Sequence, residues 1–97
     1  MIKSERKLFV IDTSVLLYDR TSIHSFPGND LVIPLVVLDE LDRFKDRKGI
    51  IGENARYINR FLDGLRQKGQ IHLGIKLENK QTIKVELSAP PVPVGLD

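Results

Sequence analysis

Two short apolar segments, each followed at once by a polar corner and a helical stretch, constrain the fold of this chain most strongly. Residues 8–11 end at Asp12-Thr13-Ser14, and residues 31–33 end at Pro34. A continuous apolar segment of this length is typical of a strand buried on both faces of a parallel sheet. Asp, Thr and Ser favour helix caps, and proline favours the first turn of a helix. The pattern therefore predicts an α/β fold with a parallel sheet.

Three helices are expected from the apolar periodicity and from the glycines that interrupt it. A short helix begins near Val15, a second covers residues 35–47, and a third runs from Gly52 or Glu53 to about residue 68. In the third helix an apolar stripe lies opposite a charged side. The stripe is Tyr57, Ile58, Phe61, Leu62 and Leu65.

Residues 71–87 alternate between apolar and polar side chains around a polar centre at 78–81, which predicts a β-hairpin. The covered face of this hairpin would carry Ile71, Leu73, Ile75 and Leu77. Residues 89–97 are rich in proline and are expected to form an extended tail or linker. Because only two core strands precede the hairpin, too few for an independent sheet of this kind, the domain is expected to be incomplete.

Composition excludes several classes of protein. The 97 residues contain no cysteine, which rules out disulfides, zinc–thiolate sites and thiol nucleophiles and suits a cytoplasmic location. The N-terminus lacks the apolar stretch of a signal peptide, and no stretch approaches the roughly 20 apolar residues that span a membrane. No GxxxxGK[ST], GxSxG or HExxH pattern occurs, so P-loop, acyl-transfer and zinc-protease chemistry have no support.

The charge of the chain is unevenly distributed, although its net value is only +2. Residues 12–42 carry six acidic side chains against one arginine, whereas residues 43–68 carry eight basic side chains against three acids. An acidic half followed by a basic half suits a metal site beside a phosphate-binding surface. Two solvated helices of opposite charge would explain the same distribution.

Two acids are candidate metal ligands and catalytic residues. Asp12 follows a strand, where open α/β sheets place their ligands, although it could instead be a helix cap. On a helical wheel Glu40 lies about 40° from Val36 and from Phe44, within the apolar arc. A glutamate held against a core usually has a partner, and an ion shared with Asp12 would provide one. The alternative is that Glu40 lies at the edge of the stripe and reaches water.

Basic side chains after these acids are candidates for binding RNA phosphates. Tyr18, near the acidic corner, is a candidate for stacking on a base. A solvated basic face is the alternative explanation for the basic set. The candidates are Arg43, Lys45, Arg47, Lys48, Arg56 and Arg60.

Two segments resemble the first two motifs of PIN domains. Phe9 to Leu17 (FVIDTSVLL) resembles the first, and Val32 to Leu41 (VIPLVVLDEL) resembles the second, with about 28 residues between Asp12 and Glu40. The continuation DRFK and the stretch 54–62 are most similar to the PIN domain at the front of PhoH-like ATPases. The resemblance covers residues 7–70 well and the hairpin loosely.

This resemblance implies an α/β/α sandwich with a parallel sheet that cleaves single-stranded RNA with Mg²⁺ or Mn²⁺. It makes Asp12 and Glu40 the first two metal-binding acids, with Thr13 and Ser14 ordering water nearby. Residues 1–88 would be the N-terminal part of such a nuclease domain. The third and fourth acids of the family would lie in later units, so these 97 residues alone are expected to cleave poorly.

Two other functions stay open at this stage. One is a non-catalytic PIN-like module that binds RNA or a protein, and the other is the toxin of a toxin–antitoxin pair. A PhoH-like ATPase domain in the parent protein and self-association are partners that the resemblance allows.

Overall fold

The computed structural model describes residues 5–87, so the predicted tail at 89–97 lies outside the described residues. Four strands form one sheet in the order β1-β2-β4-β3. β1 and β4 both pair in parallel with β2, and β3 pairs antiparallel with β4. The expected parallel α/β architecture is confirmed. The elements are β1 (Leu8–Val10), α1 (Thr13–Tyr18), the 3-10 helix η1 (Arg20–His24), β2 (Asp30–Pro34), α2 (Leu35–Phe44), α3 (Gly49–Lys68), β3 (Ile75–Lys76) and β4 (Thr82–Glu86).

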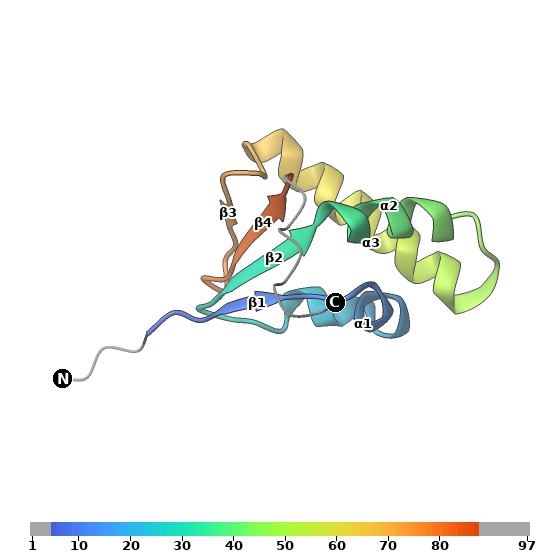
Figure 1. Ribbon diagram of the computed structural model, residues 1–97, viewed down its shortest axis with the longest axis horizontal. Helices are drawn as coiled ribbons and strands as arrows, with labels where there is room; N and C mark the ends of the chain where they lie inside the picture. Colours follow the sequence, from blue (N-terminus) through green and yellow to red (C-terminus); the bar gives the residue numbers. More distant parts are fainter. Residues whose placement is uncertain (1–4, 88–97) are drawn as a thin grey trace, which may run out of the picture.

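The hydrophobic core lies between the sheet and the helices, which Figure 1 shows gathered on one side of the strands. Leu31 and Ile33 of β2 stand in register with Ile83 and Val85 of β4, and all four are buried. Successive strand side chains alternate between faces, so these four share the face that the helices cover. The helices complete the core with Leu16, Leu17, Val37, Leu41, Ala55, Ile58, Leu62 and Leu65.

The opposite face of the sheet is uncovered within residues 5–87. Leu8 is 63% exposed and Val10 is 62% exposed, and with Val32 and Leu73 they line an open groove of about 510 Å³. The expectation that residues 8–11 are buried on both faces is therefore wrong for β1. Only Ile11 at the end of that segment is buried, as part of the core cluster that the helices complete.

The last strand differs from the sequence-based expectation in its partners. β3 and β4 do pair as a hairpin, but β3 has only two residues, and β4 also pairs along its whole length with β2. β4 is therefore a third parallel core strand. The predicted covered face of the hairpin is also wrong in part, because Leu73 lies in a turn and is 72% exposed.

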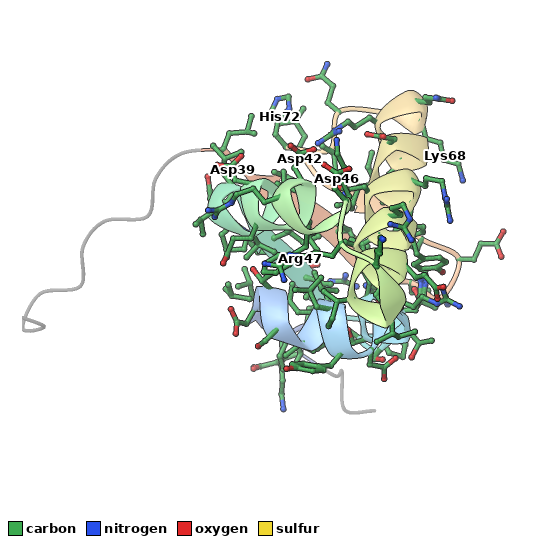
Figure 2. The ribbon with its side chains drawn as sticks, turned by 90° about the vertical axis from the view of Figure 1, so that its right-hand side faces the viewer. Asp39, Asp42, Asp46, Arg47, Lys68 and His72 are labelled. Carbon is green, nitrogen blue, oxygen red and sulfur yellow. The ribbon has the colours of Figure 1, made fainter. Side chains whose placement is uncertain are left out.

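The helix boundaries shift by a few residues from those predicted. α2 ends at Phe44, three residues earlier than expected, and α3 begins at Gly49 rather than near Gly52. The apolar stripe of α3 is confirmed, with Ile58, Leu62 and Leu65 buried. Figure 2 shows Asp39, Asp42 and Asp46 along α2 and the turn after it, and all three are exposed, as the helical wheel predicts. No helix within residues 5–87 has the length and apolar character that a membrane crossing needs.

Candidate metal and nucleic-acid site

The topology of the sheet brings Asp12 and Glu40 to one place. β1 and β2 are neighbouring parallel strands, so their carboxyl ends lie at the same edge of the sheet. Asp12 follows β1 with extended backbone angles (φ −92°, ψ 152°) and directly precedes α1. α2 starts immediately after β2 and carries Glu40 in its second turn. Both carboxylates line one pocket of about 400 Å³.

Each carboxylate accepts a hydrogen bond from a hydroxyl at the start of α1. Thr13 Oγ1 donates to Glu40 Oε1 at 2.7 Å, and Ser14 Oγ donates to Asp12 Oδ2 at 2.7 Å. Asp12 occupies the N-cap position of α1, but its side chain makes no capping hydrogen bond to the helix backbone, so capping does not account for its carboxylate. Thr13 is only 5% exposed, and its bond ties α1 to α2 across the pocket.

Glu40 lies between the two environments that the helical wheel left open. Its side chain is half-buried, with Phe44 half-buried on one side and Val36 exposed on the other. It therefore lies at the margin of the covered face of α2, where its carboxylate reaches the pocket and the Thr13 hydroxyl. That position combines access to solvent with a fixed orientation.

The rest of the pocket wall is apolar, aromatic and cationic. Leu17 and Tyr18 come from α1, Phe44 from α2 and Ile51 from α3, while Arg47 comes from the α2–α3 connection. The Arg47 guanidinium carbon lies 5.1 Å from the centre of the Phe44 ring. Figure 2 shows Arg47 in the space between α1, α2 and the start of α3. Sequence reasoning did not assign Phe44 and Ile51 to this wall. The i,i+4 spacing from Glu40 was a signal that could have found Phe44.

The six predicted RNA-binding residues are divided between two cavities and the open surface of the protein. Arg47 is the member of that set that lines the acid pocket. Lys45, Arg56 and Arg60 line a separate groove of about 490 Å³ between α2 and α3, together with acidic side chains. Arg43 and Lys48 are exposed and line neither cavity.

Two of these basic groups already have partners. Arg56 Nη1 donates to the backbone oxygen of Lys45 at 2.6 Å and to that of Arg47 at 3.3 Å, which fixes the α2–α3 connection. Lys45 Nζ lies 2.7 Å from Asp42 Oδ1, and this hydrogen bond is the main reason that the pKa of Lys45 is raised above its ordinary value. Arg47, which lines the pocket of the two acids, has neither kind of partner within the described residues.

The donor set of the pocket suits a small hard cation. Carboxylate oxygens are the ligands that Mg²⁺ prefers, and Mg²⁺ keeps several waters and is commonly bound through one or two carboxylates. Asp12 and Glu40 provide two carboxylates in one pocket. Residues 5–87 contain no cluster of three or more His, Cys, Asp or Glu side chains that could hold a metal ion. The site present is thus a two-carboxylate one.

Comparison with known proteins points to one family. The PIN domain family matches residues 9–90 of this chain. Protein PhoH2 of Bacillus subtilis is 44% identical over 82 residues, which cover 84% of this chain and 19% of that protein. Protein PhoH2 of Thermobispora bispora is 40% identical over 97 residues, covering 96% of this chain and 22% of that protein. The chain thus spans about a fifth of the length of these curated relatives. No solved structure matches it significantly.

Proposed function

The chain belongs to the PIN domain family, whose members are typically nucleases, and we propose that it supplies the first two metal-binding acids of a ribonuclease site for single-stranded RNA. The observation that carries this proposal is that Asp12 and Glu40, far apart in sequence, line one pocket and are each oriented by a neighbouring hydroxyl. The metal is Mg²⁺ or Mn²⁺, the ions that such an oxygen donor set favours.

Asp12 and Glu40 would hold the ion, which when bound activates water and neutralises charge on the phosphodiester. The residues of the chain do the positioning. The Thr13 and Ser14 hydroxyls each donate their one hydrogen bond to a carboxylate, which leaves the lone pairs of their oxygens able to accept a hydrogen bond from water. In this way the same two hydroxyls orient the acids and can order a water molecule beside them.

The activity of a longer protein that contains this domain is part of the same proposal. The relatives named PhoH2 are about five times as long as the matched region. We propose that a PhoH-like ATPase domain acts with the nuclease domain in such a polypeptide. Because the described residues offer two carboxylates in the pocket and no larger cluster, we expect the chain by itself to bind metal weakly and to cleave slowly.

A titration of Mg²⁺ or Mn²⁺ followed by NMR tests the metal site. We expect saturable changes at Asp12 and Glu40, and their loss in the variants Asp12→Asn and Glu40→Gln, because each variant removes a charged oxygen ligand. Asp39→Asn is the matched control, since Asp39 neighbours Glu40 on α2 but is exposed and lines the other groove. Equal losses in all three variants, or changes spread over every surface acid, would refute a specific site.

Thr13→Val tests whether the Thr13 hydroxyl positions Glu40. Valine keeps the shape of the buried side chain but removes the donor to Glu40 Oε1. Groups that orient a metal ligand contribute about tenfold or more to metal affinity. We therefore expect calorimetry to show about tenfold weaker Mn²⁺ binding in Thr13→Val, with wild-type affinity in Thr13→Ser. Unchanged binding in Thr13→Val would show that Glu40 needs no such orientation.

A non-catalytic RNA-binding module is the second candidate, and the two-carboxylate site is the observation that favours it. This function predicts that RNA binds equally well with a chelator present and that no Mn²⁺-dependent cleavage accumulates on long incubation. A Mn²⁺-dependent product that disappears in Asp12→Asn would decide for the nuclease.

A further inference from the structure

The acid pocket has a second zone, one helical turn beyond the carboxylates. Tyr18 lies four residues after Ser14 on α1, and Phe44 lies four residues after Glu40 on α2. Residues four apart stack on the same side of a helix, with about 6 Å between them along the axis. α1 and α2 contact each other and begin at the same end of the sheet. The pocket therefore passes from an acidic zone to an aromatic zone.

Tyr18 is a large aromatic side chain that no described residue fixes in place. Its side chain is 79% exposed, and it makes no hydrogen bond or ring contact with another described residue. The other tyrosine, Tyr57, is half-buried and its hydroxyl lies 3.0 Å from His24 Nε2. An exposed aromatic ring at the mouth of a polar pocket is a surface on which a planar ligand can stack.

Arg47 provides the positive charge of this zone. Its guanidinium lies over the half-buried Phe44 ring, with its central carbon 5.1 Å from the ring centre, and has no ion pair or hydrogen bond through its side chain within the described residues. By contrast, Lys45 is paired with Asp42, and the Arg56 guanidinium is bound to backbone carbonyls. The Phe44 ring orients the Arg47 guanidinium and leaves its N–H groups able to donate two parallel hydrogen bonds to one phosphate.

We propose that Tyr18 and Arg47 bind one unpaired nucleotide beside the acids, with the Tyr18 ring stacked on its base and the Arg47 guanidinium on its phosphate. The inference rests on the proposed function, and it adds the two residues that recognise the substrate. A ring at this place selects for unpaired bases, because both faces of a base inside a duplex are already covered by its neighbours. Arg47 would bind single strands and duplexes of any sequence, because a phosphate contact carries no sequence information.

Binding of labelled oligonucleotides tests the two roles separately. The intact chain is titrated into a short single-stranded RNA of mixed sequence and into the matching duplex, with Mg²⁺ and again with a chelator, and fluorescence anisotropy is measured. We expect Tyr18→Ala to weaken single-strand binding about tenfold and duplex binding less than about twofold. Tyr18→Phe should bind like the wild type, because the ring is kept and the hydroxyl has no partner among residues 5–87.

Arg47→Ala should weaken the binding of both the single strand and the duplex about tenfold. It should also reduce the slope of log affinity against log salt concentration by about one. Arg47→Lys should restore that slope, because the charge returns. Two controls are exposed residues outside the pocket: Val15→Ala on α1, and Arg66→Ala, whose side chain pairs with Asp63 on α3. Both are expected to leave binding unchanged.

The proposal is overturned if Tyr18→Ala affects single strand and duplex equally or not at all, or if Arg47→Ala leaves the salt slope unchanged. The metal titration of Asp12 and Glu40 tests the proposed function independently, so its outcome is unaffected by such a result. Conversely, the titration could show no metal site while the Tyr18 and Arg47 variants behave as expected. The proposed nucleotide contacts would then be supported, and the proposal of a metal-dependent nuclease would be rejected.

Discussion

Replacing Gly52 by alanine should lower the free energy of unfolding by about 3 kcal/mol, the upper end of the usual cost of forced overpacking. A Cβ added to Gly52 would lie 1.6 Å from the backbone oxygen of Arg47 and 2.6 Å from its carbonyl carbon. Backbone atoms cannot swing away as a side chain can, so either α3 or the α2–α3 connection must shift. Urea unfolding followed by circular dichroism measures the effect.

The matched control is Gly64→Ala in the same helix. A Cβ at Gly64 meets nothing within 4 Å, so alanine there should raise the free energy of unfolding by about 0.5–1 kcal/mol, the ordinary difference between the two residues inside a helix. If the two substitutions change stability alike, the close approach of α3 to the Arg47 carbonyl is not present in solution.

Gly52→Ala also has a local consequence for the proposed nucleotide site. The Arg47 carbonyl that the new Cβ would displace also accepts a hydrogen bond from Arg56, 3.3 Å away. A shift there moves Arg47, which lines the acid pocket. We therefore expect Gly52→Ala to weaken oligonucleotide binding even at temperatures at which the variant is still folded, whereas Gly64→Ala should bind like the wild type.

Replacing Gln81 by leucine should cost about 3 kcal/mol of stability, although leucine has a similar volume. Gln81 is fully buried. Its Nε2 donates to the backbone oxygen of Ile23 at 2.6 Å, and its Oε1 accepts from the backbone N–H of Phe26 at 3.2 Å. Leucine would leave both backbone groups buried without a partner, at about 1–3 kcal/mol each.

Gln67→Leu on the exposed side of α3 is the comparison for Gln81→Leu and should change stability by less than about 0.5 kcal/mol. Urea midpoints of the two variants give the difference. A loss below about 1 kcal/mol in Gln81→Leu would mean that water reaches Ile23 and Phe26 when the amide is removed. The expected loss would establish Gln81 as the tie between η1 and the turn before β4.

Two of the buried polar side chains, Gln81 and Asn54, carried a signal in the sequence. Gln81 directly precedes β4 and has the same parity as Ile83 and Val85, so extending the alternation of the strand by one residue would place it on the covered side. Asn54 lies one turn before Ile58 on the apolar stripe of α3, where its Nδ2 donates to the backbone oxygen of Leu17 at 2.7 Å. Periodicity indicates that such side chains are inside, but it does not indicate which backbone group they bind.

The helix start at Gly49 shows a different limit. Glycine reads locally as a helix breaker, which placed the expected start of α3 at Gly52 or Glu53. In the folded chain Gly49 has φ +79° and begins the helix, while Gly52 lies inside it against the Arg47 carbonyl. The reason for glycine at position 52 is a contact between two elements, and local propensity contains no information about that contact.

Residue order indicated which elements of this chain carry the two acids. Asp12 directly follows one apolar strand, and Glu40 lies on the helix that follows the other. The parallel pairing of β1 with β2 then brings both to one edge of the sheet. The tertiary structure decided the rest: that β4 pairs with β2, that one face of the sheet is open within residues 5–87, and that Arg47 reaches the acids. These depend on how separate elements pack, and neither periodicity nor charge counting measures distances between elements far apart in sequence.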